Sequence, residues 1–249
     1  MTRVLLLGGT TEAAALARHF AEGGIDAVYS YAGRTETPAA QPLPVRIGGF
    51  GGIDGLVAYL GAESITHIVD ATHPFAATMS RNAVAAAERA GVRLCAYERP
   101  AWEAEDGDDW THVADLAGAV AALPEEPSCI FLAIGRQHLS AFAALPWHRY
   151  ILRLVDAPTG ALPLPDAQVV VAKGPFTAED DTALLKSRRV NLIVAKNSGG
   201  SGARAKLVAA RALGLPVIMI DRPVLPPRQS VSSIDGIMRF LAHPADLGV

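Results

Sequence analysis

The sequence predicts an α/β fold of two similar Rossmann-like units, each built on a parallel sheet, that face a central cleft. Short apolar, β-branched runs alternate with alanine-rich stretches of helical length, an order typical of βαβ units. The second half repeats the plan of the first, since residues 50–70 match 176–196 and residues 91–99 match 214–222 at equal spacing. Upstream, RVLLLGGTTE aligns with CIFLAIGRQH. We therefore expect two different ligands, one for each unit.

The individual elements follow from apolar runs, periodicity and end signals. Apolar residues recur on one helical face from Ile53 to Leu60. Thr177 followed by Asp180 resembles a capping box that opens another helix. The alanine-rich segment 76–90 ends at Gly91, a common C-terminal stop. Strands are expected at residues 4–7, 27–31, 67–71, 92–97, 129–134, 150–155, 169–173, 192–196 and 216–220.

The predicted division gives a nucleotide-binding domain at residues 1–110 and a second Rossmann-like domain at residues 111–249. An acidic patch at residues 103–110 lies before this boundary. The final helix, expected at residues 233–242, must pack on one of the two units. The sequence therefore leaves open a crossover of the chain, or an exchange of strands, between the halves.

Composition excludes several classes of protein. Hydrophobic residues make up 50% of the chain and charged residues 19%, which suits a packed core, while the net charge of −3 argues against nucleic acid as a partner. The apolar runs are too short to span a membrane, and the N-terminus does not resemble a signal peptide. With Cys95 and Cys129 both in predicted buried strands, we expect no disulfide and a cytoplasmic location. The oligomeric state stays open, a monomer being one option.

The loop after the first strand is the first candidate binding element, because ligands of open parallel sheets bind at the carboxyl ends of the strands. Gly8 and Gly9 form a tight turn before Thr10, Thr11 and Glu12 begin a helix. Free backbone N–H groups and the positive helix end suit a diphosphate. Thr10 replaces the second glycine of the usual fingerprint. A helix N-cap by Thr10 or Thr11 is the alternative explanation.

Two further loops of the first half belong to the same predicted edge. Arg34 follows the second strand where an NAD site usually has an acidic residue, which favours the 2′-phosphate of NADP. A solvated surface arginine is the alternative. The glycines around Phe50, among them Gly49 and Gly51, would allow close approach of a dinucleotide or form a tight turn.

The loop after the fourth strand carries Asp70, Ala71, Thr72 and His73. In a dinucleotide-binding fold this loop lies near the nicotinamide. His73 could exchange a proton near neutral pH, which makes it a candidate proton donor. A structural hydrogen bond is the alternative role for this histidine.

Basic residues occupy the matching positions of the second half. Arg136, Lys173, Lys196 and Arg204 are expected to gather at one sheet edge, with Arg222 beside them. Cations that converge with few local acids favour a ligand with several carboxylates or phosphates. A solvated basic face is the alternative.

The glycine-rich stretch 198–206, which begins at Ser198, is a candidate lid over an anionic ligand. It lacks the spacing of a phosphate-binding P-loop. No His, Cys and Asp residues have metal-ligand spacing, so we expect no metal site.

The chain resembles the precorrin-6A reductase family of cobalamin biosynthesis in an ordered set of motifs: GGTTEA, GGFGG, DATHPFA, ERPAW, GRQ, KGPF, KNSGGSG and DRP. The resemblance covers nearly the whole chain, and THPFA and KNSGG are its most specific parts. Ile134 stands before GRQ where a threonine is expected.

This resemblance implies an NADPH-dependent reduction of precorrin-6A to precorrin-6B, with a hydride and a proton added across one double bond of the macrocycle. The implied NADPH site has residues Gly8, Gly9, Thr10, Thr11, Glu12, Arg34, Gly49, Phe50, Gly51, Asp70, Ala71, Thr72 and His73. The tetrapyrrole carboxylates would bind Arg136, Lys173, Lys196, Ser198, Arg204 and Arg222. The proton donor stays open between His73, a lysine of the basic edge, and water.

Two other functions are compatible with the residues alone. One is an NADP-dependent reductase of another polyanionic substrate, such as a sugar nucleotide. The other is a two-domain ligand-binding protein, against which the lack of an export signal argues. The sequence does not decide whether the substrate contains cobalt, or which face receives the hydride.

Overall fold

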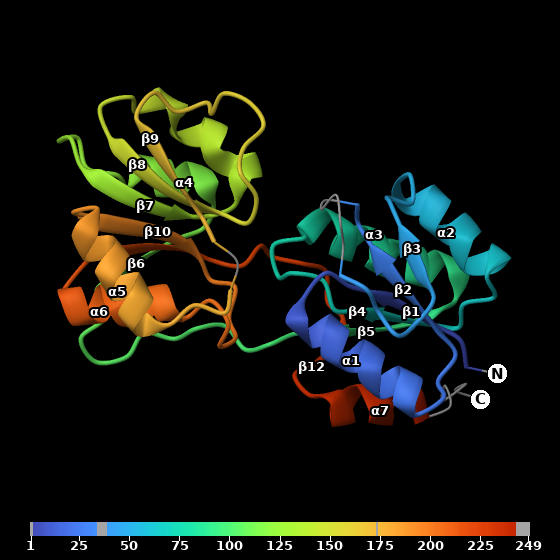
Figure 1. Cartoon of the computed structure of the whole chain (residues 1–249). Coiled ribbons are helices and arrows are strands. Elements are labelled where there is room, and N and C mark those ends of the chain that lie inside the picture. The colour runs from blue at the N-terminus through green and yellow to red at the C-terminus, as the bar shows by residue number, and fades with distance from the viewer. Residues whose placement is uncertain (1, 34–38, 173, 243–249) are drawn as a thin grey trace. The chain divides into compact units, whose positions relative to one another are not determined.

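A computed structural model describes residues 2–33, 39–172 and 174–242. The chain forms two compact units (Figure 1). Unit 1 combines Met1–Pro100 with Val224–Val249, and unit 2 contains Ala101–Pro223. Both units are α/β structures, which confirms the predicted fold class.

The two sheets have the same strand order, and every strand pair is parallel. The sheet of unit 1 has the order β12-β5-β4-β1-β2-β3, and that of unit 2 has the order β6-β11-β10-β7-β8-β9. Matching β1–β5 with β7–β11 superimposes the two orders, so the internal repeat predicted from the sequence is a repeat of topology. The strands of unit 1 are β1 (Val4–Leu7), β2 (Ala27–Tyr31), β3 (Val45–Ile47), β4 (His67–Asp70), β5 (Arg93–Tyr97) and β12 (Gln229–Val231). Those of unit 2 are β6 (Trp110–Val113), β7 (Cys129–Ala133), β8 (Arg149–Leu154), β9 (Ala167–Val171), β10 (Leu192–Lys196) and β11 (Val217–Ile220).

Each sheet takes its sixth strand, at the edge, from the stretch of chain that follows the five strands of the other unit. After β5 the chain leaves unit 1, and its next strand, β6, pairs with β11 of unit 2. After β11 the chain returns, and β12 pairs with β5 of unit 1. The two units have thus exchanged their edge strands, the arrangement that the sequence left open. Neither short edge strand has a strong apolar run.

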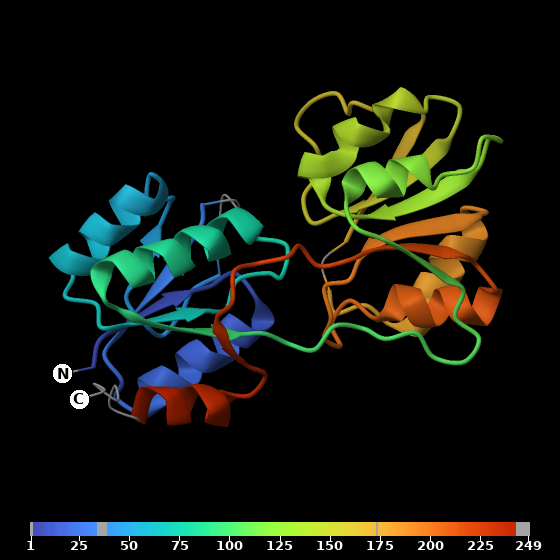
Figure 2. The ribbon, with the colours of Figure 1, turned by 180° about the vertical axis from the view of Figure 1, so that it is seen from behind.

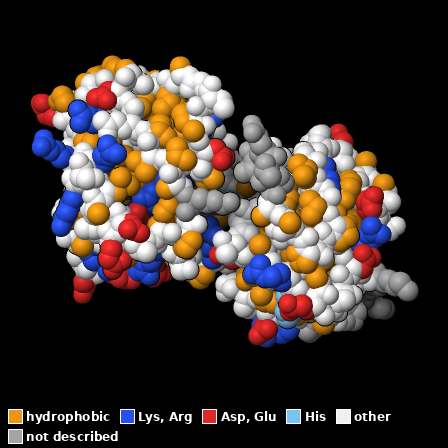
Figure 3. Space-filling model, in the orientation of Figure 1, with side chains coloured by type: hydrophobic (Ala, Val, Ile, Leu, Met, Phe, Trp, Pro, Cys, Tyr) orange, Lys and Arg blue, Asp and Glu red, His pale blue; other side chains and the backbone are white. Residues whose placement is uncertain are grey.

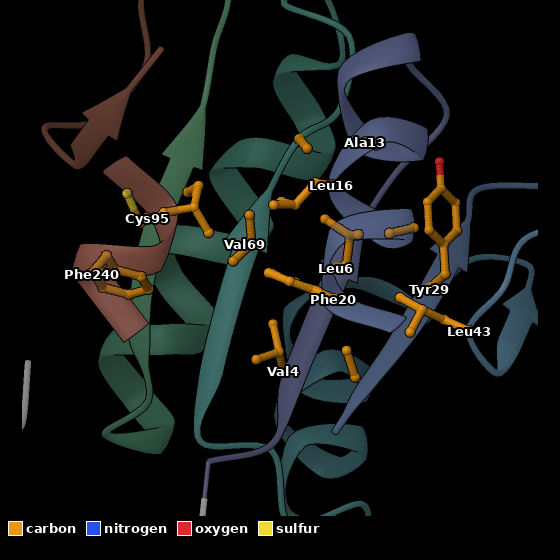
Figure 4. Close-up of a cluster of buried hydrophobic side chains, with 14 of the residues drawn as sticks. Val4, Leu6, Ala13, Leu16, Phe20, Tyr29, Leu43, Val69, Cys95 and Phe240 are labelled. Carbon is orange, nitrogen blue, oxygen red and sulfur yellow. The ribbon is translucent and has the colours of Figure 1, made fainter. Parts of the chain in front are cut away.

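The exchange moves the boundaries away from the predicted division at residues 110 and 111. Unit 2 begins at Ala101, and the C-terminal segment from Val224 belongs to unit 1. The physical reason is burial: Ile237 and Phe240 of the last helix enter the same apolar core as Phe20 (Figure 4). That helix is amphipathic, and the face that carries these side chains needs a sheet to cover.

Helices cover both faces of the sheet in unit 1 (Figures 1 and 2). Helices α1 and α7 pack on one face, where Leu6, Val69 and Cys95 are buried beneath them. Helices α2 and α3 pack on the other face over Leu5 and Ile68. The helices are α1 (Thr11–Glu22), α2 (Gly52–Ala62), α3 (Ala77–Ala90) and α7 (Ile234–Ala242).

Unit 2 has the corresponding layers. Helices α5 and α6 contact each other and pack on one face of the sheet, over Phe131, Ile193 and Met219. Helix α4 contacts the 3₁₀ helix η1, which follows β7. The helices of this unit are α4 (Leu116–Ala121), η1 (Arg136–Ala144), α5 (Ala178–Ser187) and α6 (Ala205–Leu213).

The local signals that defined helix ends are confirmed. Thr177 caps α5 by accepting a hydrogen bond from the Asp180 amide at 3.1 Å, and its hydroxyl donates to the Asp180 carboxylate. Helix α3 ends at Gly91, whose φ of 66° lies in the left-handed region. Cys95 and Cys129 are both buried, as expected.

Candidate active site

The loops that follow β1 and β4 are joined at the carboxyl edge of the first sheet. Thr10 is the N-cap of α1, and its hydroxyl accepts a hydrogen bond from the Ala13 amide at 3.1 Å. The same hydroxyl donates to the carbonyl of Ala71 at 2.8 Å. The N-cap that was the simpler reading of Thr10 is therefore present, and it also fixes the neighbouring loop. Thr11 and Glu12 form the first turn of the helix.

Gly8 and Gly9 are required by the geometry of the turn. A Cβ atom on Gly8 would lie 2.1 Å from a ring carbon of Tyr29, so no larger residue fits there. The Tyr29 hydroxyl accepts a hydrogen bond from the Gly9 amide at 2.9 Å, and burial raises the pKa of this hydroxyl to about 12. Gly9 itself has a φ of 109° and is exposed. Tyr29 thus holds the turn from its buried side, while Gly9 faces solvent.

Asp70 organises the loop after β4 through both of its carboxylate oxygens. Oδ1 accepts hydrogen bonds from the amide and the hydroxyl of Thr72, at 3.2 and 2.7 Å. Oδ2 accepts from the hydroxyl of Ser80 at 2.6 Å and from the Arg228 guanidinium at 3.3 Å. Asp70 is only 3% exposed. Its geometry supports a role in shaping the loop, whereas the sequence suggested a direct contact with the cofactor.

His73 is exposed at the tip of this loop. Its Nδ1 accepts a hydrogen bond from the amide of Phe75 at 3.2 Å, and the two rings lie 5.9 Å apart. Because Nδ1 is the acceptor, the neutral ring carries its proton on Nε2. As a proton donor His73 would act in its imidazolium form, in which Nδ1 also carries a proton and no longer accepts the Phe75 amide. His73 stays a candidate for that role.

A shallow depression lies above these loops in unit 1. It is bordered by side chains of the first turn of α1 and by residues that follow β5. The Arg99 guanidinium pairs with the Glu12 carboxylate at 2.7 Å across it. Its full lining is Thr10, Glu12, Thr72, Pro74, Tyr97, Glu98 and Arg99.

Sequence reasoning missed three of the charged residues around this depression. Glu98 and Arg99 lie in the ERP motif directly after β5, where their position at a strand end was the available signal. Arg228 had no signal, because it precedes an edge strand that contributes only three residues to the sheet. Its place beside Asp70 depends on the exchange of strands.

The glycine loop after β3 is shaped by Arg46. This guanidinium donates to the carbonyls of Gly48 and Gly49, at 2.8 and 3.1 Å, and lies 3.8 Å from the centre of the Phe50 ring. Gly51 has a φ of 79° at the start of α2. The glycines thus satisfy a tight strand–helix turn, which was one of the two expected explanations. Arg34, the predicted ligand of a 2′-phosphate, lies outside the described residues.

In unit 2, the loop after β10 is held by a neutral amide. The Asn197 side chain accepts a hydrogen bond from the Trp102 amide at 2.7 Å and donates to the Trp102 carbonyl at 2.9 Å. The Trp102 indole donates to the carbonyl of Gly200 at 2.7 Å. Arg222 donates to the carbonyls of Asn197 and Ser198, at 3.0 and 3.3 Å. The Arg222 guanidinium therefore binds backbone carbonyls of this loop.

Arg204 departs from the prediction of a basic edge with few acids. Its guanidinium pairs with Glu105, which also pairs with Arg211 at 2.7 Å, and Arg211 in turn pairs with Asp108 at 2.9 Å. Hydrogen bonds from Arg204 and Arg211 hold the pKa of Glu105 below its usual value. Figure 3 shows acidic and basic side chains intermingled on the lower part of unit 2. The acidic patch that sequence reasoning used as a boundary marker thus neutralises part of the predicted cation cluster.

The other predicted cations keep positions at the carboxyl edge of the second sheet. Arg136 is exposed at the start of η1, which follows β7. Lys196 is the last residue of β10 and is partly buried. Ser198 is 8% exposed in the loop beyond it. Lys173 lies outside the described residues. The glycine-rich lid predicted here is tied to unit 2 by Trp102, Arg222 and the Arg204 ion pair, and its motion stays a prediction.

Some features of the first edge would suit a dinucleotide. Gly9 is exposed beside the N-terminus of α1, and the Tyr29 ring leaves no space for a larger residue at Gly8, so a diphosphate could approach the backbone of this turn closely. Within the described residues, no group of three or more His, Cys, Asp or Glu side chains could hold a metal ion. Over the same residues, no helix has both the length and the apolar character that a membrane crossing requires.

Known proteins provide an independent comparison. Residues 3–242 match the family described as Precorrin-6x reductase CbiJ/CobK. A precorrin-6A reductase of Rhodobacter capsulatus is 62% identical over 97% of this chain and 96% of its own length, and one of Mycobacterium tuberculosis is 42% identical over 99% of both. A cobalt-precorrin-6A reductase of Priestia megaterium is 32% identical over 96% of this chain and 98% of its own. A solved structure titled CobK precorrin-6A reductase has a TM-score of 0.93 and 62% identity over 97% of this chain and 96% of its own.

Proposed function

The chain belongs to the precorrin-6x reductase family, as its motifs predicted, and from this premise we propose that it reduces precorrin-6A to precorrin-6B with NADPH. The observation that carries the proposal is the full-length similarity to precorrin-6A reductases, which spans both units. The residues of the two sheet edges support it.

We assign the cofactor to unit 1. Gly8, Gly9 and the N-terminus of α1 would bind its diphosphate through backbone N–H groups. Thr10 would keep this turn in register with the loop that carries Thr72 and His73. Arg34 would bind the 2′-phosphate that separates NADPH from NADH.

We assign the tetrapyrrole to unit 2. Its acetate and propionate groups would pair with Arg136 and Lys196, and with Lys173 of the KGPF loop. Arg204 is bound to Glu105 in this structure, so it would need to exchange that partner for a substrate carboxylate. Ser198 and Arg222 would act through the shape of the loop after β10.

The residues of the chain contribute mainly position. When bound, the nicotinamide supplies the hydride for one carbon of the macrocycle double bond. The proton for the neighbouring carbon would come from the imidazolium form of His73, which becomes a neutral imidazole as it donates. In that form Nδ1 carries a proton, so the hydrogen bond from the Phe75 amide would have to open first. Holding the reacting atoms close together accounts for most of the expected rate gain.

The direct test is reduction of precorrin-6A by the purified protein. We expect oxidation of NADPH only when the tetrapyrrole is present, and a product heavier by two hydrogens. A protein that binds NADPH but reduces a different polyanion would keep the first half of the proposal and lose the second. A protein that binds no NADPH would support a ligand-binding role instead.

The metal state of the substrate can be tested in the same assay. Relatives named for precorrin-6A reach 62% identity, whereas the cobalt-precorrin-6A reductase of Priestia megaterium is 32% identical. We therefore propose the metal-free tetrapyrrole as the substrate. A higher kcat/KM with the cobalt form would reverse this assignment.

Cofactor choice depends on Arg34. The Arg34→Ala variant should bind NADPH about 1.5–3 kcal/mol more weakly, the range for hydrogen bonds to charged groups, while NADH binding barely changes. Equal losses for the two cofactors would rule out a contact with the 2′-phosphate.

A further inference from the structure

One guanidinium joins two carboxylates beneath the depression of unit 1. Arg228 donates to Asp70 Oδ2 at 3.3 Å and also to Glu98, which follows β5. Its side chain is 8% exposed, so the cation is almost fully removed from water. A cation buried to this degree needs paired charges, and the two carboxylates supply them.

The two carboxylates depend on Arg228 in return. Asp70 ends β4 and Glu98 follows β5, and these strands are neighbours in the sheet. Both acids bind the same guanidinium, so without it the buried carboxylate of Asp70 would lose its cation and would face the partly exposed carboxylate of Glu98. Repulsion would then act on the two loops that follow β4 and β5.

Asp70 passes this constraint to the loop. The oxygen that does not bind Arg228 accepts the amide and the hydroxyl of Thr72, and Thr72 lines the depression. Glu98 lines it as well, and Arg99 beside it pairs with Glu12. Arg228 thus contacts Glu98, which lines the depression, and Asp70, which holds the lining residue Thr72.

We propose that Arg228 is a positioning residue of the cofactor site, which acts through Asp70 on the loop at Thr72 and through Glu98 on the loop after β5. The inference rests on the assignment of NADPH to unit 1. It gives the returning C-terminal segment a role in cofactor binding, in addition to its pairing with β5.

The experiment measures NADPH affinity by fluorescence titration of the full chain. Arg228→Met should lose about tenfold in affinity, because a charge-assisted bond to a buried carboxylate is removed. Arg228→Lys keeps the charge but not the fork that spans two acids, so it should lose less. Adding Glu98→Gln to Arg228→Met removes the repulsion and should recover part of the loss.

Arg89→Met is the matched control, because Arg89 forms an exposed ion pair with Asp54 on the same unit. It should bind NADPH as the unchanged protein does. In steady-state assays Arg228→Met should raise KM for NADPH but leave KM for precorrin-6A unchanged, a split that general destabilisation would not produce. Unchanged NADPH affinity in Arg228→Met, or no recovery in the double variant, overturns the proposal. Should Arg228→Met fail to fold, Arg228→Lys decides in the same way against Arg89→Met.

A second readout separates this inference from the proposed function. Hydrogen exchange at the Thr72 amide should be faster in Arg228→Met than in Arg89→Met, whatever the ligand is. If the unchanged protein binds no NADPH, the proposed function fails, and the exchange rate alone tests whether Arg228 positions the loop. Equal exchange in the two variants would refute the positioning role.

Discussion

The loop after β4 in unit 1 and the loop after β10 in unit 2 occupy the same place in the two repeats but are held by opposite chemistry. In unit 1 the carboxylate of Asp70 is bound by a cation, Arg228. In unit 2 the neutral amide of Asn197 is bound by the backbone of Trp102. Both partners come from the segments that cross between the units.

This difference shows which property the duplicated fold preserves. Arg228 precedes β12 and Trp102 precedes β6, the two exchanged edge strands. Topology therefore brings a partner to the same loop in each unit, while the side chains decide whether the contact is ionic or neutral. We call the two hydrogen bonds between the Asn197 side chain and the Trp102 backbone the neutral clamp. This clamp adds no carboxylate near Lys196, at the end of β10. In unit 1 the corresponding contact is ionic: the charges of Arg228 and Asp70 balance each other, and both side chains are buried.

The largest expected effect concerns the neutral clamp. Asn197→Ala leaves both backbone groups of Trp102 without their buried partner, and should lower the free energy of unfolding by about 3 kcal/mol or more. Asn191→Ala is the matched control, because Asn191 makes one such bond, to the Cys129 amide, from an exposed position. Urea denaturation measures both. A loss for Asn197→Ala no greater than for Asn191→Ala would mean that the clamp is dispensable.

The next effect separates the first loops of the two units. The sequence alignment places Gly8 opposite Ile134, but the strand pairing shifts the match by one residue, to Gly135, where a Cβ atom would meet nothing within 4 Å. In unit 1 the Tyr29 ring fills the corresponding space, so Gly8→Ala should destabilise the protein by about 2 kcal/mol through overpacking. Gly61→Ala in α2 meets no atom within 4 Å and should be neutral or stabilising. Thermal unfolding of the two variants tests this, and tolerance of alanine at Gly8 would show that Tyr29 moves aside.

A smaller effect tests the assignment of ligands. Lys196→Ala and Arg136→Ala should each weaken tetrapyrrole binding by about 1.5 kcal/mol, the cost of a hydrogen bond to a charged group, and leave NADPH affinity intact. Separate titrations with the two ligands measure this. A fall in NADPH affinity instead would show that the two edges have been assigned the wrong way round.

The smallest effect is shared by both units, since each buries a histidine. Burial lowers the pKa of His67 in unit 1 and of His148 in unit 2. The unfolded chain takes up these protons below its histidine pKa of about 6.5, while the folded chain resists, so stability falls as the pH drops. Each histidine contributes at most about 1 kcal/mol between pH 6.5 and 5.5. Urea titrations of His67→Gln and His148→Gln should show a flatter pH dependence; an unchanged slope would assign it to other groups.

The sequence by itself determined the features that depend on local chemistry. Apolar runs predicted the central strands of both sheets, since a parallel strand is buried on both faces. Thr177 and Gly91 marked helix ends because caps satisfy backbone groups only a few residues away. The motifs also identified the family, and the internal repeat predicted that two units share one plan.

Only the tertiary structure decided which charges meet. Arg228 reaches Asp70 across 158 positions of sequence, and Arg204 reaches Glu105 across 99. These partners depend on the short edge strands β6 and β12, whose pairing draws on neighbouring strands more than on their own residues. The periodicity of the sequence carries no information about such pairing. The basic edge predicted for unit 2 therefore did not include Glu105, the acid that pairs with Arg204. The buried cation of unit 1 was unpredictable for the same reason.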